Sequence, residues 1–348
     1  NNRDNVLPLQ KTGQKIALIG PFVQDRENIE GCWTLFGDKE RYVTLEQGVR
    51  AVVAVDNLSV VAGCGLEEPL PGGISAAIDA AQAADVVVLA LGEPQRFSGE
   101  AQSRTEITLP PAQQALAEAV AATGTPMVIL LRNGRALALS GAVRDADAIA
   151  VTWYLGTQTG TGVADVLFGD YNPSARLPIS FPQVTGQQPY FYNHLRTGRP
   201  ELPTLSEYKA RWREMPNEPL YPFGHGLSYT TFAYAAPQLS TTQLGWEQTL
   251  TITTRVTNTG AVAGEEVVQL YVHDRVASRV RPVRELKGFR KVLLQPGESA
   301  EVVFTLQRDA LAFTNHKGVF GAEPGLFDVW VCASAKSGEP VSFELLDR

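Results

Sequence analysis

The run Asp85-Val86-Val87-Val88-Leu89-Ala90-Leu91 (residues 85–91) decides the fold of the first half of the chain. Its side chains are apolar or β-branched at consecutive positions, which is typical of a parallel strand buried on both faces. Similar short apolar runs occur at residues 15–20, 126–131 and 147–153. Segments of helical composition alternate with these runs, at residues 74–84, 110–124 and 161–168. The alternation predicts an α/β sandwich, in which helices flank a mostly parallel sheet.

The second half of the chain has a different hydrophobic pattern, because apolar and polar residues alternate in short segments separated by turn signals. These segments are residues 250–256, 266–272, 284–289, 301–306, 326–331 and 341–345. They predict an all-β sandwich of about seven strands. We therefore divide the chain into an α/β domain (1–182), an ordered connection (183–235) and a β domain (236–348).

Composition excludes several classes of protein. The chain has 348 residues, 44% of them hydrophobic, and a net charge of −7, so neither nucleic acid nor a membrane surface is an expected partner. No apolar run is long enough to span a membrane. Three cysteines and four histidines show no metal-ligand spacing, and we expect no metal. The chain opens at Asn1 and its first methionine is Met127, so we expect it to be part of a longer protein.

A long loop follows residues 85–91, at the end of the strand where open α/β sheets place their ligands. It carries two carboxylates, Glu93 and Glu100, and two arginines, Arg96 and Arg104. A carboxylate on such a loop is a candidate general acid or base. The alternative is that these are solvated loop charges that pair with one another.

The loop after the first strand carries Trp33, whose flat ring is suited to stacking on a sugar. The alternative is that Trp33 packs beneath its loop as a small core. Other templates are absent, because the chain has no GxGxxG, P-loop or GxSxG sequence, and we expect no cofactor. We interpret His225, in a glycine-rich turn, as structural.

Several long motifs share one likeness. They are residues 5–9 (NVLPL), 169–182 (GDYNPSARLPISFP), 221–232 (YPFGHGLSYTTF), 256–260 (VTNTG), 266–271 (EVVQLY) and 281–289 (RPVRELKGF). In this order they resemble the C-terminal half of family 3 glycoside hydrolases, and most of all the periplasmic β-glucosidases of that family. The resemblance covers essentially the whole chain and implies that the β domain is fibronectin-III-like.

The resemblance also implies an activity. Such enzymes are retaining, exo-acting β-glucosidases that hydrolyse terminal β-D-glucosyl residues with two carboxylates about 5 to 5.5 Å apart. Their nucleophile lies on an N-terminal (β/α)8 barrel, which this chain lacks. Residues 100–110 (EAQSRTEITLP) match the family's acid/base loop, which implies that Glu100 is the acid/base and Glu93 its backup. Trp33, Glu93 and Arg104 are then the expected substrate-binding residues, with Trp33 at the leaving-group subsite.

The expected partners are a β-glucoside or oligosaccharide substrate and the barrel half of the same enzyme, and a homodimer is left open. The expected location is periplasmic or secreted, and the chain alone is expected to be inactive. Three positions depart from the family pattern, namely Gly99 for histidine, Ala175 for glycine and His225 for tyrosine. A non-catalytic carbohydrate-binding or assembly module is the competing hypothesis.

Overall fold

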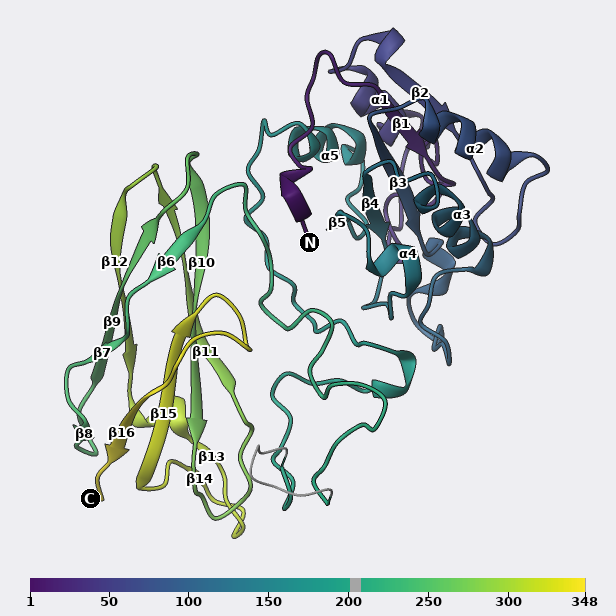
Figure 1. The fold of residues 1–348 in the computed structure, drawn as a ribbon. Helices are drawn as coiled ribbons and strands as arrows, with labels where there is room; N and C mark the ends of the chain where they lie inside the picture. Colours follow the sequence, from purple (N-terminus) through teal and green to yellow (C-terminus); the bar gives the residue numbers. More distant parts are fainter. Residues whose placement is uncertain (201–207, 348) are drawn as a thin grey trace. The chain divides into compact units, whose positions relative to one another are not determined.

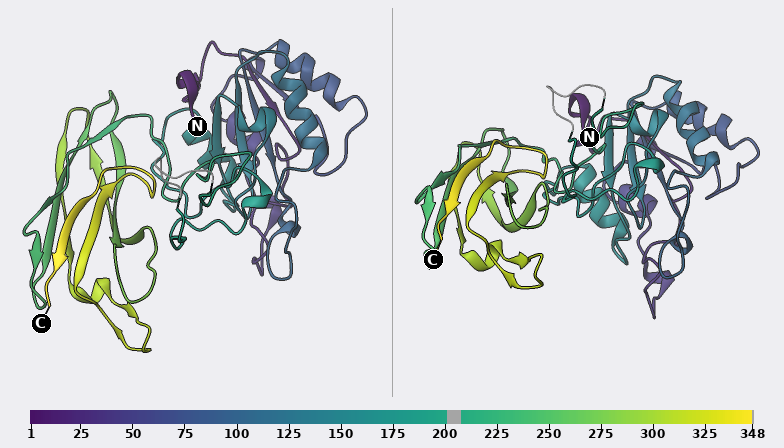
Figure 2. Two further views of the ribbon diagram at one scale, coloured as in Figure 1. Left: turned by 60° about the horizontal axis from the view of Figure 1, so that its bottom comes forward. Right: turned by 90° about the horizontal axis from the view of Figure 1, so that it is seen from below.

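The computed structural model describes residues 1–200 and 208–347. The chain forms two compact units, which Figures 1 and 2 show from several sides. The first unit contains Asn1–Tyr171 and Pro182–Gln188, and the second contains Asn172–Phe181 and Pro189–Arg348. Each unit has its own sheets and is described by itself.

A five-stranded parallel sheet forms the centre of the first unit, in the order β2-β1-β3-β4-β5. Its strands are β1 (Ile16–Ile19), β2 (Leu58–Val61), β3 (Val86–Gly92), β4 (Met127–Arg132) and β5 (Ala148–Val151). Every residue of β1, β3 and β4 is buried, as expected for strands covered on both faces. The predicted α/β class is therefore confirmed.

Helices cover both faces of this sheet (Figure 1). They are α1 (Leu45–Arg50), α2 (Gly73–Gln82), α3 (Pro111–Ala121), α4 (Gly141–Arg144) and α5 (Thr159–Leu167). Local sequence explains where two of them begin. The Thr44 hydroxyl and the Gln47 side chain form a capping box at α1, and Pro111 occupies the first turn of α3.

The strand order contains a reversal that matters for function. From β1 the chain crosses to β2 at one edge of the sheet, whereas from β3 it crosses to β4 in the opposite direction. With right-handed crossovers, the loops after β1 and β3 leave toward opposite faces of the sheet. Doubly wound sheets bind their ligands at such a reversal.

The second unit is built from strands that pair antiparallel, apart from the parallel pair β16–β8, which confirms the predicted all-β fold of this part of the chain (Figure 1). One sheet has the order β11-β10-β15-β16-β8 and another the order β12-β9-β6, with β7 also paired to β9. The bounds are β6 (Phe232–Tyr234), β7 (Gln238–Leu239), β8 (Gln243–Leu244), β9 (Leu250–Asn258), β10 (Gly264–Asp274), β11 (Glu285–Leu294), β12 (Ser299–Leu306), β13 (Phe313–Thr314), β14 (Phe320–Gly321), β15 (Gly325–Cys332) and β16 (Val341–Leu345). Alternating residues of β9 and β12 point into one apolar core.

A buried ion pair fastens residues 172–181 to this β unit. The Arg176 guanidinium donates to Oε2 of Glu266 at 2.5 Å, and the Tyr234 hydroxyl donates to Oε1 of the same carboxylate at 2.6 Å. We call these three side chains the Arg176 bracket. Its position inside residues 169–182 gives that motif a structural role.

Stacked rings order part of the predicted connection. Tyr192 lies on Phe223 with their ring centroids 4.1 Å apart, and Tyr221 lies on His225 at 5.3 Å. Tyr208, in contrast, is exposed. Residues 201–207 of the connection lie outside the described residues. The division of the chain into domains at 1–182, 183–235 and 236–348 stays a prediction.

Candidate active site

Two loops meet at the reversal of the sheet. The loop between β1 and α1 carries Trp33, and the loop between β3 and α3 carries Glu93, Glu100 and Arg104. The two loops come together at two points. The amide of Gln95 donates to the Asn28 side chain at 2.9 Å. The Cys32 Sγ lies 2.8 Å from the point where a Cβ on Gly99 would stand, so glycine is the residue that fits there.

Glu100 lies at the exposed tip of the second loop, in a turn. The residue before it, Gly99, has φ +115°, and the residue after it, Ala101, has φ +60°. Both values lie in the left-handed region, which costs a non-glycine residue about 1 kcal/mol or more. Within residues 1–200 and 208–347, no ion pair or hydrogen bond engages the Glu100 side chain. The carboxylate is therefore available to another molecule.

Glu93 has the opposite environment, because it is fully buried. Its carboxylate lies 3.5 Å from Nη1 of Arg104 and 3.3 Å from Nε of Arg135. Burial raises the pKa of Glu93, and the two arginines oppose that rise without cancelling it. The alternative that loop charges pair with one another thus describes Glu93 and Arg104, but not Glu100.

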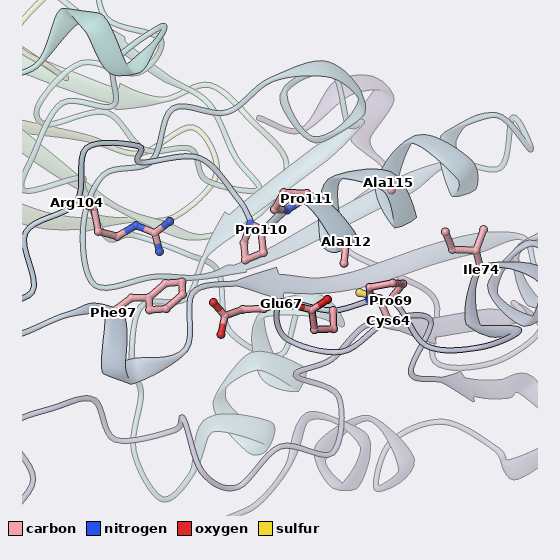
Figure 3. Close-up of a pocket in the computed structure, with 11 residues that line it drawn as sticks. Cys64, Glu67, Pro69, Ile74, Phe97, Arg104, Pro110, Pro111, Ala112 and Ala115 are labelled. Atoms are coloured by element: carbon pink, nitrogen blue, oxygen red, sulfur yellow. The ribbon is translucent and has the colours of Figure 1, made fainter.

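Arg104 lies over an aromatic ring beside a groove. Its guanidinium carbon is 4.1 Å from the centroid of the Phe97 ring, and its Nε donates to the Glu106 carbonyl at 3.0 Å. Figure 3 shows Arg104 and Phe97 facing Glu67 across this groove, which has a volume of about 560 Å³. Glu67 is itself paired with Arg96. The groove therefore presents charged groups of both signs beside an apolar floor.

Trp33 projects into solvent, with 72% of its surface exposed. Leu35 and Phe36 in the same segment are even more exposed. Trp33 therefore does not pack beneath its loop, and the alternative of a small core around it is wrong. An indole in this position is free to stack on a ring or to contact another protein surface.

Sequence reasoning missed two arginines that organise this edge of the sheet. Arg132, the last residue of β4, is buried and donates to Asp25 at 2.8 Å. Arg135, three residues later, donates to Glu93 and to the carbonyls of Phe97 and Gln102. For Arg132 the sequence did offer a signal, because this charged residue directly follows the apolar run 126–131 at the carboxyl end of a strand.

All three cysteines are free, and the Cys64 thiol has its pKa raised to about 11 by burial. Across the described parts of the chain, no group of three or more His, Cys, Asp or Glu side chains is arranged to hold a metal ion. Over the same residues no helix has the length and apolar character that crossing a bilayer requires.

The chain belongs to family 3 of the glycosyl hydrolases. Residues 1–229 match the family model described as the glycosyl hydrolase family 3 C-terminal domain. Residues 266–335 match a fibronectin type III-like domain, which confirms the predicted character of the β unit.

Individual relatives agree with this assignment. The chain is 42% identical to the periplasmic beta-glucosidase of Salmonella typhimurium, over 99% of this chain and 48% of the relative. It is 37% identical to a beta-xylosidase of Formosa agariphila, over 97% of this chain and 47% of the relative. A crystal structure of the beta-glucosidase from Listeria innocua in complex with glucose superposes with a TM-score of 0.94 at 40% identity, covering 99% of this chain and 47% of that one. The chain thus spans about half the length of the relatives it matches.

Proposed function

We propose that this chain is the acid/base-bearing part of a retaining β-glucosidase, and that Glu100 is the general acid/base. One observation carries the proposal. Of the two carboxylates on the β3–α3 loop named by the sequence, Glu100 is exposed at the reversal of the sheet, whereas Glu93 is buried between two arginines. A general acid must reach the glycosidic oxygen, and Glu100 is the carboxylate that is free to do so.

The chemistry requires two carboxylates with separate tasks. In the first step Glu100 donates its proton to the leaving-group oxygen while a nucleophile attacks the anomeric carbon. In the second step Glu100 accepts a proton from the water that releases the sugar. We propose that the nucleophile comes from a (β/α)8 barrel half of the same enzyme, because the chain spans about half of its relatives.

Two other residues have proposed roles in holding the leaving group. Trp33 offers an exposed indole face to the ring next to the cleaved bond. Arg104, with about a quarter of its side chain exposed, offers donors at the base of the same loop. Glu93 was predicted to contact substrate or to replace Glu100. Its burial favours a different role, as the counter-ion that orients Arg104 and Arg135.

The names of relatives suggest a location and a range of substrates. One is called a periplasmic beta-glucosidase, so we propose a periplasmic or secreted protein. Another is called a beta-xylosidase, so the test includes a xyloside beside the glucoside. A homodimer is left open in this proposal, and no residue is assigned to its interface.

The test uses this chain together with a barrel half and aryl β-glucosides. We expect the chain alone to be inactive and the mixture to be active. Glu100→Gln should slow hydrolysis of substrates with poor leaving groups by about 10²- to 10⁴-fold, because general acid catalysis contributes that much. Dinitrophenyl glucosides, whose leaving group needs no proton, should still form the glycosyl-enzyme at nearly the normal rate.

Glu106→Gln is the matched control. Glu106 lies six residues further on, is exposed, and accepts a hydrogen bond from the Thr185 hydroxyl at 3.2 Å. We expect its variant to keep the rate on every substrate. Equal losses in the two variants, or a full rate in Glu100→Gln on poor leaving groups, would exclude Glu100 as the acid/base. Activity of the chain alone would exclude a nucleophile on another half, and an inactive mixture that still binds sugar would favour the non-catalytic module.

A further inference from the structure

The backbone around Glu100 has little regular structure to hold it. A short 3-10 turn, Gln95–Phe97, is the last regular element before Glu100. Beyond it, the amide of Gln102 reaches the Gly99 carbonyl at 3.4 Å, which is a long hydrogen bond. The left-handed backbone of Ala101, directly after Glu100, adds strain, whereas Gly99 adopts its positive φ freely. A loop with these properties keeps one conformation only if contacts from outside it impose that conformation.

Arg135 provides such contacts on both sides of Glu100. Its Nη2 donates to the carbonyl of Phe97, three residues before Glu100, and to the carbonyl of Gln102, two residues after it, at 3.0 Å in the latter case. Its Nε lies 3.3 Å from Glu93 at the base of the loop. One guanidinium therefore joins the two limbs of the loop to each other and to the end of β3.

Residues at the ends of β3 and β4 hold Arg135 in place. The Asn133 side chain donates to the Arg135 carbonyl at 2.5 Å, and Asn133 is fully buried directly after β4. Glu93 is buried directly after β3, which is paired with β4. Because both anchors follow neighbouring strands of a buried sheet, the guanidinium has a fixed place from which to position the loop. A planar group with several fixed donors suits this task better than a lysine does.

We infer that Arg135 is a positioning residue for Glu100, which sets how far the carboxylate reaches toward the glycosidic oxygen. This inference rests on the proposed function, in which Glu100 donates the proton. The proposed role of Arg135 needs no contact with the substrate. Arg135 acts by fixing the carbonyls of Phe97 and Gln102, so its loss should affect proton donation more than sugar binding.

The test compares Arg135→Gln, Arg135→Lys and Glu100→Gln in the reassembled enzyme, on β-glucosides that differ only in the leaving group. We expect Arg135→Gln to lower kcat on poor leaving groups by about 10²-fold, since a misplacement of about 1 Å has such an effect. We expect its KM, and its rate of glycosyl-enzyme formation from a dinitrophenyl glucoside, to change by less than about threefold. Arg135→Lys keeps a charge beside Glu93 and should recover part of the rate.

Arg96→Gln is the matched control, because Arg96 lies in the same loop but pairs outward with Glu67. It should behave as the unmodified enzyme. If Arg135→Gln loses rate equally on all leaving groups, or if Arg96→Gln loses as much, Arg135 has only a structural role and the inference is wrong. If Glu100→Gln itself shows no leaving-group dependence, the proposed function fails instead, and the two failures are thereby distinguished.

A second measurement is made on this chain without the barrel half. Hydrogen exchange at the amides of Ser98 and Gln102 reports whether the loop is held, because these amides donate to carbonyls within it. We expect both Arg135 variants to speed this exchange at least tenfold without speeding exchange in β3 or β4. Unchanged exchange in the loop would overturn the inference. If Arg135→Gln does not fold, the same two measurements on Arg135→Lys support or overturn the inference.

Discussion

Glu93 and Glu266 are both buried carboxylates paired with arginine, but their surroundings differ. In the β unit, Glu266 receives a hydrogen bond on each oxygen, from Arg176 at 2.5 Å and from Tyr234 at 2.6 Å. At the edge of the parallel sheet, Glu93 has its arginines at 3.3 and 3.5 Å, and its Oε1 makes no hydrogen bond. Both carboxylates are buried, so burial by itself does not separate a structural group from one near a site.

The difference teaches where each unit leaves a buried carboxylate oxygen without a hydrogen bond. The Arg176 bracket fastens a chain segment to a sandwich, and a carboxylate bonded on both oxygens does that with little movement. Glu93 lies under a loop whose position matters for the proposed chemistry, and its arginines also hold other groups. Substitutions at buried and half-buried ionisable side chains test this contrast.

Breaking the Arg176–Glu266 pair should have the largest effect on stability. Glu266→Gln leaves the Arg176 guanidinium buried without its counter-charge, and the expected loss in the free energy of unfolding is about 3 kcal/mol. Urea unfolding of the chain measures it. Glu265→Gln is the control, since Glu265 pairs with Lys291 at a half-exposed site and should lose less than about 1 kcal/mol. Equal losses of unfolding free energy in the two variants would mean that the buried pair contributes no more than the half-exposed one.

His225 tests the same region through pH. Burial lowers the pKa of His225 to about 4, and the charge of Arg176 acts in the same direction. A histidine whose folded pKa lies below its usual 6.5 stabilises the fold fully above pH 6.5 and loses that contribution as the pH falls toward 4. The loss is roughly 3 kcal/mol at most, from 1.36 kcal/mol for each pKa unit.

His225→Tyr, the residue in the resembling family segment, should remove this loss. The measurement is the difference in unfolding free energy between the variant and the unmodified chain from pH 7.5 to pH 4. A difference that stays constant over this range would contradict the buried, neutral histidine.

Glu93→Gln should show a smaller effect with the opposite pH dependence. Because the pKa of Glu93 is raised, its contribution to stability is full below its usual value near 4.5 and is lost as the pH rises through the raised value. We expect the variant to gain on the unmodified chain by about 1 kcal/mol as the pH rises from 4 to 7. Thermal unfolding over this range measures it, and a relative loss instead would mean that Glu93 is as well satisfied as Glu266.

A half-exposed pair gives the smallest expected effect. Burial alone would raise the pKa of Asp328, but hydrogen bonds from Arg275 and Ser342 outweigh it and hold the pKa below its usual value. Asp328→Asn should therefore cost about 1 kcal/mol at neutral pH, and the cost should begin to shrink below the usual pKa of about 3.8 and vanish as the pH falls through the lowered value. Chemical unfolding at pH 7 and pH 3 checks this, and a cost as large at pH 3 as at pH 7 would show that the ion pair is not its source.

Sequence patterns predicted the long strands well, because their composition leaves little choice of environment. β3 and β4 are apolar throughout and fully buried, whereas β9 and β12 in the sandwich alternate in both polarity and burial. The edge strand β2 was missed, since its four residues are only partly buried and include Ser59. Helix α1 was missed as well. It contains Gly48, which reads as a breaker in sequence but is needed where the Gly160 backbone approaches closely.

The candidate site was only partly predictable for a related reason. Glu100 and Trp33 were found because they follow strands in loops, and the structure exposes both. Arg135 was not found, because its partners at Phe97 and Gln102 are backbone carbonyls, which carry no sequence signal. Its distance of 42 residues along the chain from Glu93 also hides their contact until the strands are placed side by side.

The contacts of Arg135 with main-chain oxygens have a practical consequence for enzyme engineering. Anchors of this kind are indifferent to the side chains of Phe97 and Gln102, so they survive changes in the residues between them. Ala101, beside Glu100 and between these two anchors, is therefore a position that a mutant library can randomise, with Gly99, Glu100 and the scaffold left intact. Such a library would sample new placements of the proton donor by varying a single codon.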